Sequence, residues 1–240
     1  MDALRTVTYL NTSDSPSSAD RTITFLVSDA SDVSNAETRT ILVVPQQDAP
    51  LLSGMEGTVV GYVENDPAVL ITQTLSISDR DSTDLAGATV QITGNFNAAQ
   101  DVLSFTDAGN ITGVYTAGVL TLSGLDSVAS YQAALRTVRY VNTSDAPTAL
   151  ARTVTFRVDD GTGLSNTQAR TISVTPRNDA PVLAGIELAA LGYVERAPAT
   201  AVTSSLNVVD ADSAQLASAT VQVTQNFIRT EDVLGFVNGN

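Results

Sequence analysis

Pro176-Arg177-Asn178-Asp179-Ala180-Pro181 decides how this chain is organised, because the stretch returns in altered form as Pro45-Gln46-Gln47-Asp48-Ala49-Pro50. Each copy follows alternating apolar residues and precedes new apolar positions, as a connection between two β domains would. Proline fixes φ and lacks a backbone donor, so neither copy can continue a sheet. We interpret residues 45–50 as a first joint between domains and residues 176–181 as a second joint.

The two joints belong to an internal repeat. Asp48 and Asp179 are 131 residues apart, and a shift by this distance aligns residues 3–105 with 134–236 without a gap. About half of the aligned positions are identical, which indicates a true repeat. We expect residues 48–178 to form one complete repeat. Residues 1–47 would be the C-terminal part of a first repeat and residues 179–240 the N-terminal part of a third, within a longer array.

Composition excludes several functions. The net charge is −14, all twelve cations are arginines, and the chain has no Cys, His, Lys or Trp. Such a charge opposes binding to nucleic acid or to an anionic membrane surface. The apolar content of 43% is too high for a disordered acidic chain. No long apolar run and no leader pattern is seen, so we expect no membrane insertion and place any secretion signal outside this chain.

Short runs of alternating apolar residues separated by turn residues predict an all-β sandwich with one short helix per repeat. In the complete repeat the helix is expected near 127–135, where Ser127 can cap it. The expected strands are 58–63, 70–77, 88–93, 102–105, 113–116, 119–122, 137–141, 153–158 and 170–175. Before the first joint we expect strands at 6–9, 21–27 and 39–44. The predicted inner face consists of Leu75, Ile77, Val90, Ile92, Leu103, Val138, Tyr140, Val154, Phe156, Val158 and Val174, and Tyr62 and Tyr193 are also expected to be buried.

Acidic residues recur at fixed distances from the joints. Asp79-Arg80-Asp81-Ser82 begins 31 residues after Asp48, and Asp210-Ala211-Asp212-Ser213 begins 31 residues after Asp179. Oxygen ligands without His or Cys favour Ca²⁺, which takes six to eight of them. Asp and Asn also form ordinary turns, and we interpret Asp14 and Asp145 as turn formers and Asp101 and Asp232 as strand starts. The candidate ligands are Asp48, Glu64, Asp79, Asp81, Asp160, Asn178, Asp179, Glu195, Asp210 and Asp212.

The stretch from Phe156-Arg157-Val158-Asp159-Asp160-Gly161 to the second joint resembles the end of a cadherin-like domain, with an acidic turn, a last strand and an Asn-Asp-x-Pro linker. The whole repeat is similar to the cadherin-like, Ig-like tandem repeats of large bacterial surface proteins, such as type I secreted (RTX) adhesins. The resemblance implies that each Asp-x-Asp pair binds Ca²⁺ together with the preceding joint. It also implies that Glu64 and Glu195 reach toward the joint that follows them.

We therefore expect a structural extender segment of an extracellular adhesin or surface filament, rigidified by Ca²⁺ between neighbouring repeats. An enzyme is not expected, because the chain lacks the His, Cys and Lys on which ordinary nucleophilic catalysis depends.

Two alternatives stay open. Loops such as 142–150 could recognise a surface glycan or a protein. The parts at 1–47 and 179–240 could also complete each other between molecules by strand addition, giving head-to-tail assembly.

Overall fold

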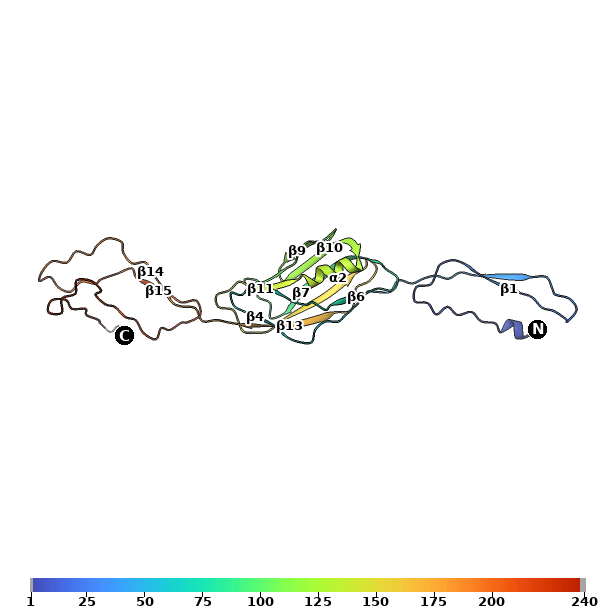
Figure 1. Ribbon diagram of the computed structural model, residues 1–240, viewed down its shortest axis with the longest axis horizontal. Coiled ribbons are helices and arrows are strands. Elements are labelled where there is room, and N and C mark those ends of the chain that lie inside the picture. The colour runs from blue at the N-terminus through green and yellow to red at the C-terminus, as the bar shows by residue number, and fades with distance from the viewer. Residues whose placement is uncertain (1, 238–240) are drawn as a thin grey trace. The chain divides into compact units, whose positions relative to one another are not determined.

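Strands make up most of the regular structure in the computed structural model, which describes residues 2–237 (Figure 1). The chain forms two units, Met1–Arg177 and Asn178–Asn240. The all-β class predicted from the alternating pattern is confirmed, because within residues 2–237 only two short helices accompany the strands.

Residues 51–175 form a β-sandwich-like pair of sheets. The larger sheet has the order β4 (Val60–Val63), β13 (Gln168–Thr175), β12 (Arg152–Asp159), β7 (Asp84–Gly94), β10 (Val119–Ser127) and β9 (Thr112–Thr116). The smaller sheet has the order β5 (Val69–Leu70), β11 (Arg139–Asn142) and β8 (Asp101–Ser104), and β3 (Leu51–Ser53) pairs with β6 (Ser76–Ser78). Most neighbours run antiparallel, but β13 and β4 are parallel, with Ile172 opposite Val60 and Thr175 opposite Val63.

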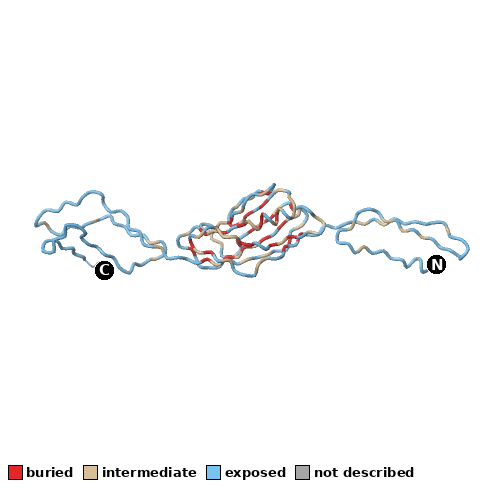
Figure 2. The backbone as a smooth tube through the Cα atoms, viewed as in Figure 1, coloured by how far each residue is buried: buried red, intermediate tan, exposed pale blue. Residues whose placement is uncertain are grey.

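The core lies between these sheets, and Figure 2 shows that the buried positions fall within this segment. Every residue predicted for the inner face is buried. The burial of β12 alternates strictly from Arg152 to Val158, as expected for a strand with one face in the core. Tyr62 is also buried, and its ring packs edge-on against Tyr140 with 5.5 Å between the ring centroids.

Helix α2 (Val128–Arg136) covers part of this core. The backbone amide of Ser130 donates to Oγ of Ser127 over 3.1 Å, which makes Ser127 the N-cap. Tyr131 and Leu135 are buried on the inner face of the helix. The predicted helix is thereby confirmed.

The expected strand at 70–77 is wrong in its middle. Only β5 and β6 form, at the two ends of this stretch. The reason is a side chain from an earlier turn, since the amides of Gln73 and Thr74 donate to Oε1 of Glu56 over 2.7 and 3.1 Å. These amides are therefore satisfied by a carboxylate and not by a neighbouring strand.

Residues 2–47 contain helix α1 (Asp2–Arg5) and an antiparallel pair, β1 (Arg21–Phe25) and β2 (Glu37–Ile41). The strand predicted at 6–9 is wrong, since these residues have no regular structure. Their counterparts 131 residues later lie at β11, which is held by β5 and β8. Residues 2–47 have no counterpart of either partner.

Residues 178–237 form one pair, β14 (Val182–Ala184) with β15 (Asn207–Val209). None of the described residues of this unit is buried. The predicted burial of Tyr193 is wrong, because this side chain is 60% exposed. Its counterpart Tyr62 is covered by Tyr140, and residues 178–237 have no counterpart of Tyr140.

Candidate metal centres at the joints

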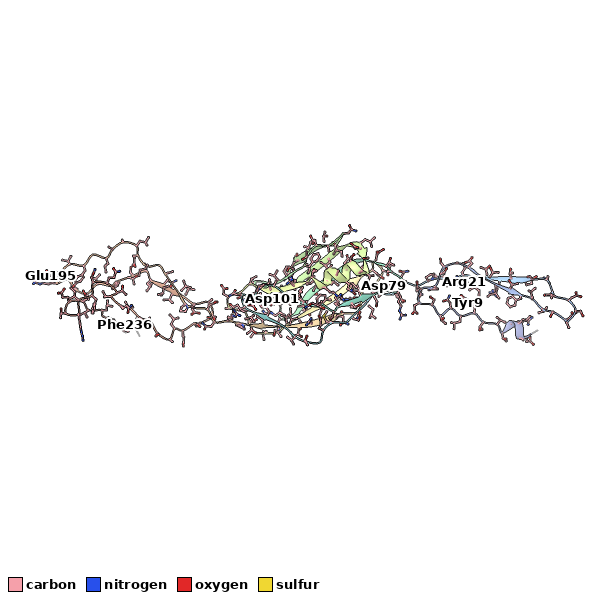
Figure 3. All side chains as sticks on the ribbon, in the orientation of Figure 1. Tyr9, Arg21, Asp79, Asp101, Glu195 and Phe236 are labelled. Carbon is pink, nitrogen blue, oxygen red and sulfur yellow. The ribbon has the colours of Figure 1, made fainter. Side chains whose placement is uncertain are left out.

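The first acidic turn follows β6 and folds around its own backbone. Oδ1 of Asp79 accepts hydrogen bonds from the amides of Asp81, over 3.2 Å, and Ser82, over 2.9 Å. Oδ2 of Asp81 accepts from the amide of Asp48 over 2.8 Å. The predicted ligands Asp48, Asp79 and Asp81 are therefore brought together, with Asp79 labelled in Figure 3.

The second acidic turn has the same geometry within its own unit. Oδ1 of Asp210 accepts from the amides of Asp212, over 3.2 Å, and Ser213, over 2.8 Å. Oδ2 of Asp212 accepts from the amide of Asp179 over 3.0 Å. Asp179, Asp210 and Asp212 thus repeat the arrangement of the first joint. Asn178 precedes them and donates from its side chain to the carbonyl of Asp179 over 2.6 Å.

Two carboxylate oxygens of the first turn are buried without a hydrogen-bond partner in the described part of the chain, namely Oδ2 of Asp79 and Oδ1 of Asp81. Burial raises the pKa of Asp79, against the effect of the two amides, and the negative charge of Asp81 raises it further. An unpaired buried carboxylate oxygen is costly, and a bound cation would remove this cost.

Glu64 occupies the other end of the complete repeat, next to the second joint. Its side chain is fully buried directly after β4, and Oε2 accepts from the amide of Arg177 over 2.8 Å. Oε1 is buried and has no hydrogen-bond partner among the described residues. A carboxylate oxygen of Asp145 lies within 4.8 Å of one of Glu64.

Asp145 is a candidate ligand that the sequence analysis missed, because it was interpreted as a turn former. Its recurrence as Asp14 was visible in the sequence, but Asp and Asn recur in turns for purely local reasons. Only the folded chain brings Asp145, which follows β11, toward Glu64, which follows β4.

The remaining predicted ligands are placed differently. Asp160 lies in the turn between β12 and β13, where Oδ1 accepts from the amides of Thr162 and Gly163, each over 2.7 Å. Burial alone would raise the pKa of Asp160, but these hydrogen bonds lower it. Gly163 in the same turn lies against Ala49, so Asp160 faces the first joint. The carboxylate of Glu195 is 85% exposed and lies 3.5 Å from Nε of Arg196 (Figure 3).

All the groups gathered in the two turns are hard oxygen donors, which suits Ca²⁺ in coordination number and in chemistry. The first turn offers free carboxylate oxygens on Asp79 and Asp81, and the Glu64 end offers one more. The residues present therefore fit a calcium ion on donor chemistry and on unsatisfied oxygens.

The fold and these turns define a mostly β, β-sandwich-like protein with acidic turns beside its domain joints. No protein-family model matches the chain. Over 139 residues, or 55% of the chain, it is 32% identical to Halomucin from Haloquadratum walsbyi. The chain spans only 2% of Halomucin, which is therefore several thousand residues long. Within residues 2–237 no helix is long and apolar enough to cross a membrane.

Proposed function

We propose that this chain is an extender segment of an extracellular structural protein, in which Ca²⁺ bound at the joints stiffens a string of cadherin-like repeats. The similarity to part of Halomucin supports a role within a very long chain. In this proposal the chain has no catalytic activity, and its partners are neighbouring repeats.

One observation carries the proposal. The same three-residue constellation occurs at both joints, with the amide of Asp48 bound to Asp81 over 2.8 Å and that of Asp179 bound to Asp212 over 3.0 Å. The first copy contains carboxylate oxygens that are buried without a partner. A turn that served only itself would satisfy these oxygens with its own amides or expose them to water.

At the second joint we propose that Glu64 and Asp145 act with Asp179, Asp210 and Asp212. The amide of Arg177 is fixed to Glu64, and Asp179 follows two residues later. Two residues of extended chain reach about 7 Å at most, so a joint anchored at Arg177 keeps Asp179 within range of Glu64. Ca²⁺ bound there would supply the positive charge that relieves repulsion among these carboxylates.

This arrangement explains how binding would change the shape of an array. The prolines at both joints restrict the backbone, and the carboxylates on either side of a joint repel each other without a cation. A cation that binds the ordered joint better than the open joint stabilises the ordered joint by mass action. We expect each repeat to change its freedom of rotation, not its fold.

The test is a Ca²⁺ titration from EDTA, with the melting temperature and the radius of gyration from small-angle scattering measured in parallel and Mg²⁺ as the competing ion. We expect Ca²⁺ to raise the melting temperature and to lengthen the particle. The double variant Asp79→Asn/Asp81→Asn should lose part of both responses.

The matched control is Asp20→Asn/Asp107→Asn, which removes the same charge from two exposed carboxylates that accept no hydrogen bond among the described residues. It should respond to Ca²⁺ as the unmodified chain does. Equal responses of the two double variants, or no response of the parent chain, would refute the calcium proposal.

A further inference from the structure

Residues 2–47 present an apolar face, which we call the N-terminal face. It lines an open groove, and three of its side chains are strongly exposed: Leu4 by 46%, Val7 by 59% and Tyr9 by 41%. Tyr9 is labelled in Figure 3. The face consists of Leu4, Val7, Tyr9, Ile23, Phe25 and Ile41.

The complete repeat shows what such a face is built to contact. The counterparts of these six residues, 131 positions later, are all 0% exposed in the core of residues 51–175. They are Leu135, Val138, Tyr140, Val154, Phe156 and Ile172. An exposed apolar surface of this composition marks an interaction site.

Residues 178–237 present the opposite half of the same core, which we call the C-terminal face. It consists of Leu183, Tyr193, Leu206, Val221, Val223 and Leu234, which are between 40% and 74% exposed. Their counterparts Leu52, Tyr62, Leu75, Val90, Ile92 and Leu103 are at most 3% exposed. Part of this face lines a groove with Asp232.

Strand pairing is complementary as well. Strand β12 is paired on both edges, with β13 and with β7, whereas its counterpart β1 is paired only with β2. The counterpart of β7 is the stretch 215–225, which has no regular structure. An open strand edge and an extended segment of matching sequence are the two partners of strand addition.

Charge distinguishes the two faces. In the complete repeat, Arg152 pairs with Asp101 over 3.2 Å and Arg170 pairs with Glu56 over 2.7 Å. The counterparts of both arginines, Arg21 and Arg39, belong to residues 2–47, and the counterparts of both carboxylates belong to residues 178–237. Across the described residues, none of these four counterparts forms an ion pair: Arg21, Arg39, Asp232 and Glu187.

We propose that the N-terminal face of one molecule binds the C-terminal face of a second copy, so that the chain assembles head to tail through a composite sandwich. Arg21 then pairs with Asp232 of the second copy, and Arg39 pairs with its Glu187. Tyr193 packs against Tyr9, as Tyr62 does against Tyr140.

The register follows from the complete repeat. Val154 lies opposite Ile92, and Thr155 lies opposite Gln91. Ile23 is therefore expected opposite Val223, and Thr24 opposite Gln222. The composite sandwich lacks counterparts of β9 and β10, so one edge of the 215–225 strand stays open and association is weaker than the folding of a complete repeat.

The first experiment reverses one ion pair. Sedimentation of the full chain in EDTA, over a range of protein concentrations, should show assembly that Arg39→Glu weakens at least about tenfold, since facing like charges repel. Glu187→Arg should act in the same way. The double variant Arg39→Glu/Glu187→Arg should recover assembly, because every contact again joins opposite charges.

Arg229→Glu is the matched control, because Arg229 is exposed and lies on neither face. It should assemble as the parent does. A parent chain that stays monomeric at every concentration overturns the proposal, as does a double variant that is no better than either single variant. Since EDTA removes Ca²⁺, this result is independent of the calcium titration.

The second experiment fixes the register and the occupant. The chain has no cysteine, so Thr24→Cys/Gln222→Cys introduces a single possible disulfide pair per contact. Directly opposed strand positions have the Cα separation that a disulfide requires. Mild oxidation should give a ladder of linked multimers, and the off-register pair Thr24→Cys/Thr220→Cys should link more slowly. Equal rates, or a product linked only within one molecule, would overturn binding of a second copy.

Discussion

Arg152 and Asp101 form an ion pair in which Nε lies 3.2 Å from both carboxylate oxygens, and neither side chain is exposed to solvent. Oδ1 of Asp101 also accepts from Oη of Tyr140 over 2.6 Å and from Nδ2 of Asn142 over 2.9 Å. These residues come from β8, β11 and β12, so one carboxylate links strands of both sheets. Burial and the nearby carboxylate raise the pKa of Tyr140, which therefore stays a hydrogen-bond donor.

Removing the arginine of this pair should be severely destabilising. Arg152→Met leaves the buried charge of Asp101 without its cation, and breaking a buried pair in this way costs about 3–5 kcal/mol. Urea denaturation should show this loss in the free energy of unfolding. Arg229→Met, at an exposed position, should change it little. A loss for Arg152→Met no larger than that of the control would mean that the pair does not stabilise the fold.

Glu56 should make stability depend on pH in the acid range. Burial alone would raise the pKa of Glu56, but hydrogen bonds from Gln73 and Thr72 and the charge of Arg170 lower it from 4.5 to about 2. A lowered pKa means that this stabilisation is complete above pH 4.5 and is lost as the pH falls toward 2.

The variant Glu56→Gln should therefore be less stable than the parent at neutral pH, with the difference shrinking between pH 4.5 and about 2. Thermal unfolding at a series of pH values measures this difference. Glu231→Gln changes an exposed carboxylate and should run parallel to the parent. A constant difference for Glu56→Gln across the acid range would contradict the assignment.

Gly54 should not tolerate a side chain. Its φ is +70°, and a Cβ there would lie 2.7 Å from the carbonyl oxygen of Thr74. The left-handed conformation alone costs roughly 1–2 kcal/mol for an L-residue, so Gly54→Ala should lower the free energy of unfolding by at least this amount. Gly57→Ala is the control, since no atom lies within 4 Å of a Cβ at Gly57. Equal stability of the two variants in chemical denaturation would rule out this explanation.

The buried end of Glu64 gives a prediction for the second joint. Glu64→Gln keeps the size of the side chain and removes the charge that would hold Ca²⁺ with Asp145. We expect this variant to bind Ca²⁺ more weakly, by about tenfold or more, since a charged ligand contributes on the order of 1.5–3 kcal/mol. Isothermal titration calorimetry measures the affinity, and Glu231→Gln serves again as the control. An unchanged affinity would exclude Glu64 as a ligand.

Alternation along the sequence was sufficient to predict the inner face of the sandwich. The side chains of Val154, Phe156 and Val158 are buried as predicted, because the two-residue period of a strand fixes which side chains share a face. The break at residues 71–75 could not be predicted in this way. It depends on Glu56, whose carboxylate captures two amides that a local pattern assigns to a strand.

The joints show a similar division. The spacing of Asp48, Asp79 and Asp81 predicted a cluster that the structure brings together, because the turn itself organises these residues. Asp145 and Asp101 were interpreted from their neighbours in sequence alone. Their roles depend on Glu64 and Arg152, which are distant in sequence and come close only through the pairing of the sheets.

The parallel pairing of β4 with β13 has a mechanical consequence. The chain passes from the first joint toward β4 and leaves β13 directly into the second joint. Tension along an array therefore pulls two parallel strands from opposite ends, and it loads the ladder from Val60–Ile172 to Val63–Thr175 in shear. Its hydrogen bonds then resist together and do not open one at a time, so a repeat of this topology withstands stretching better than its modest number of bonds at this edge would indicate.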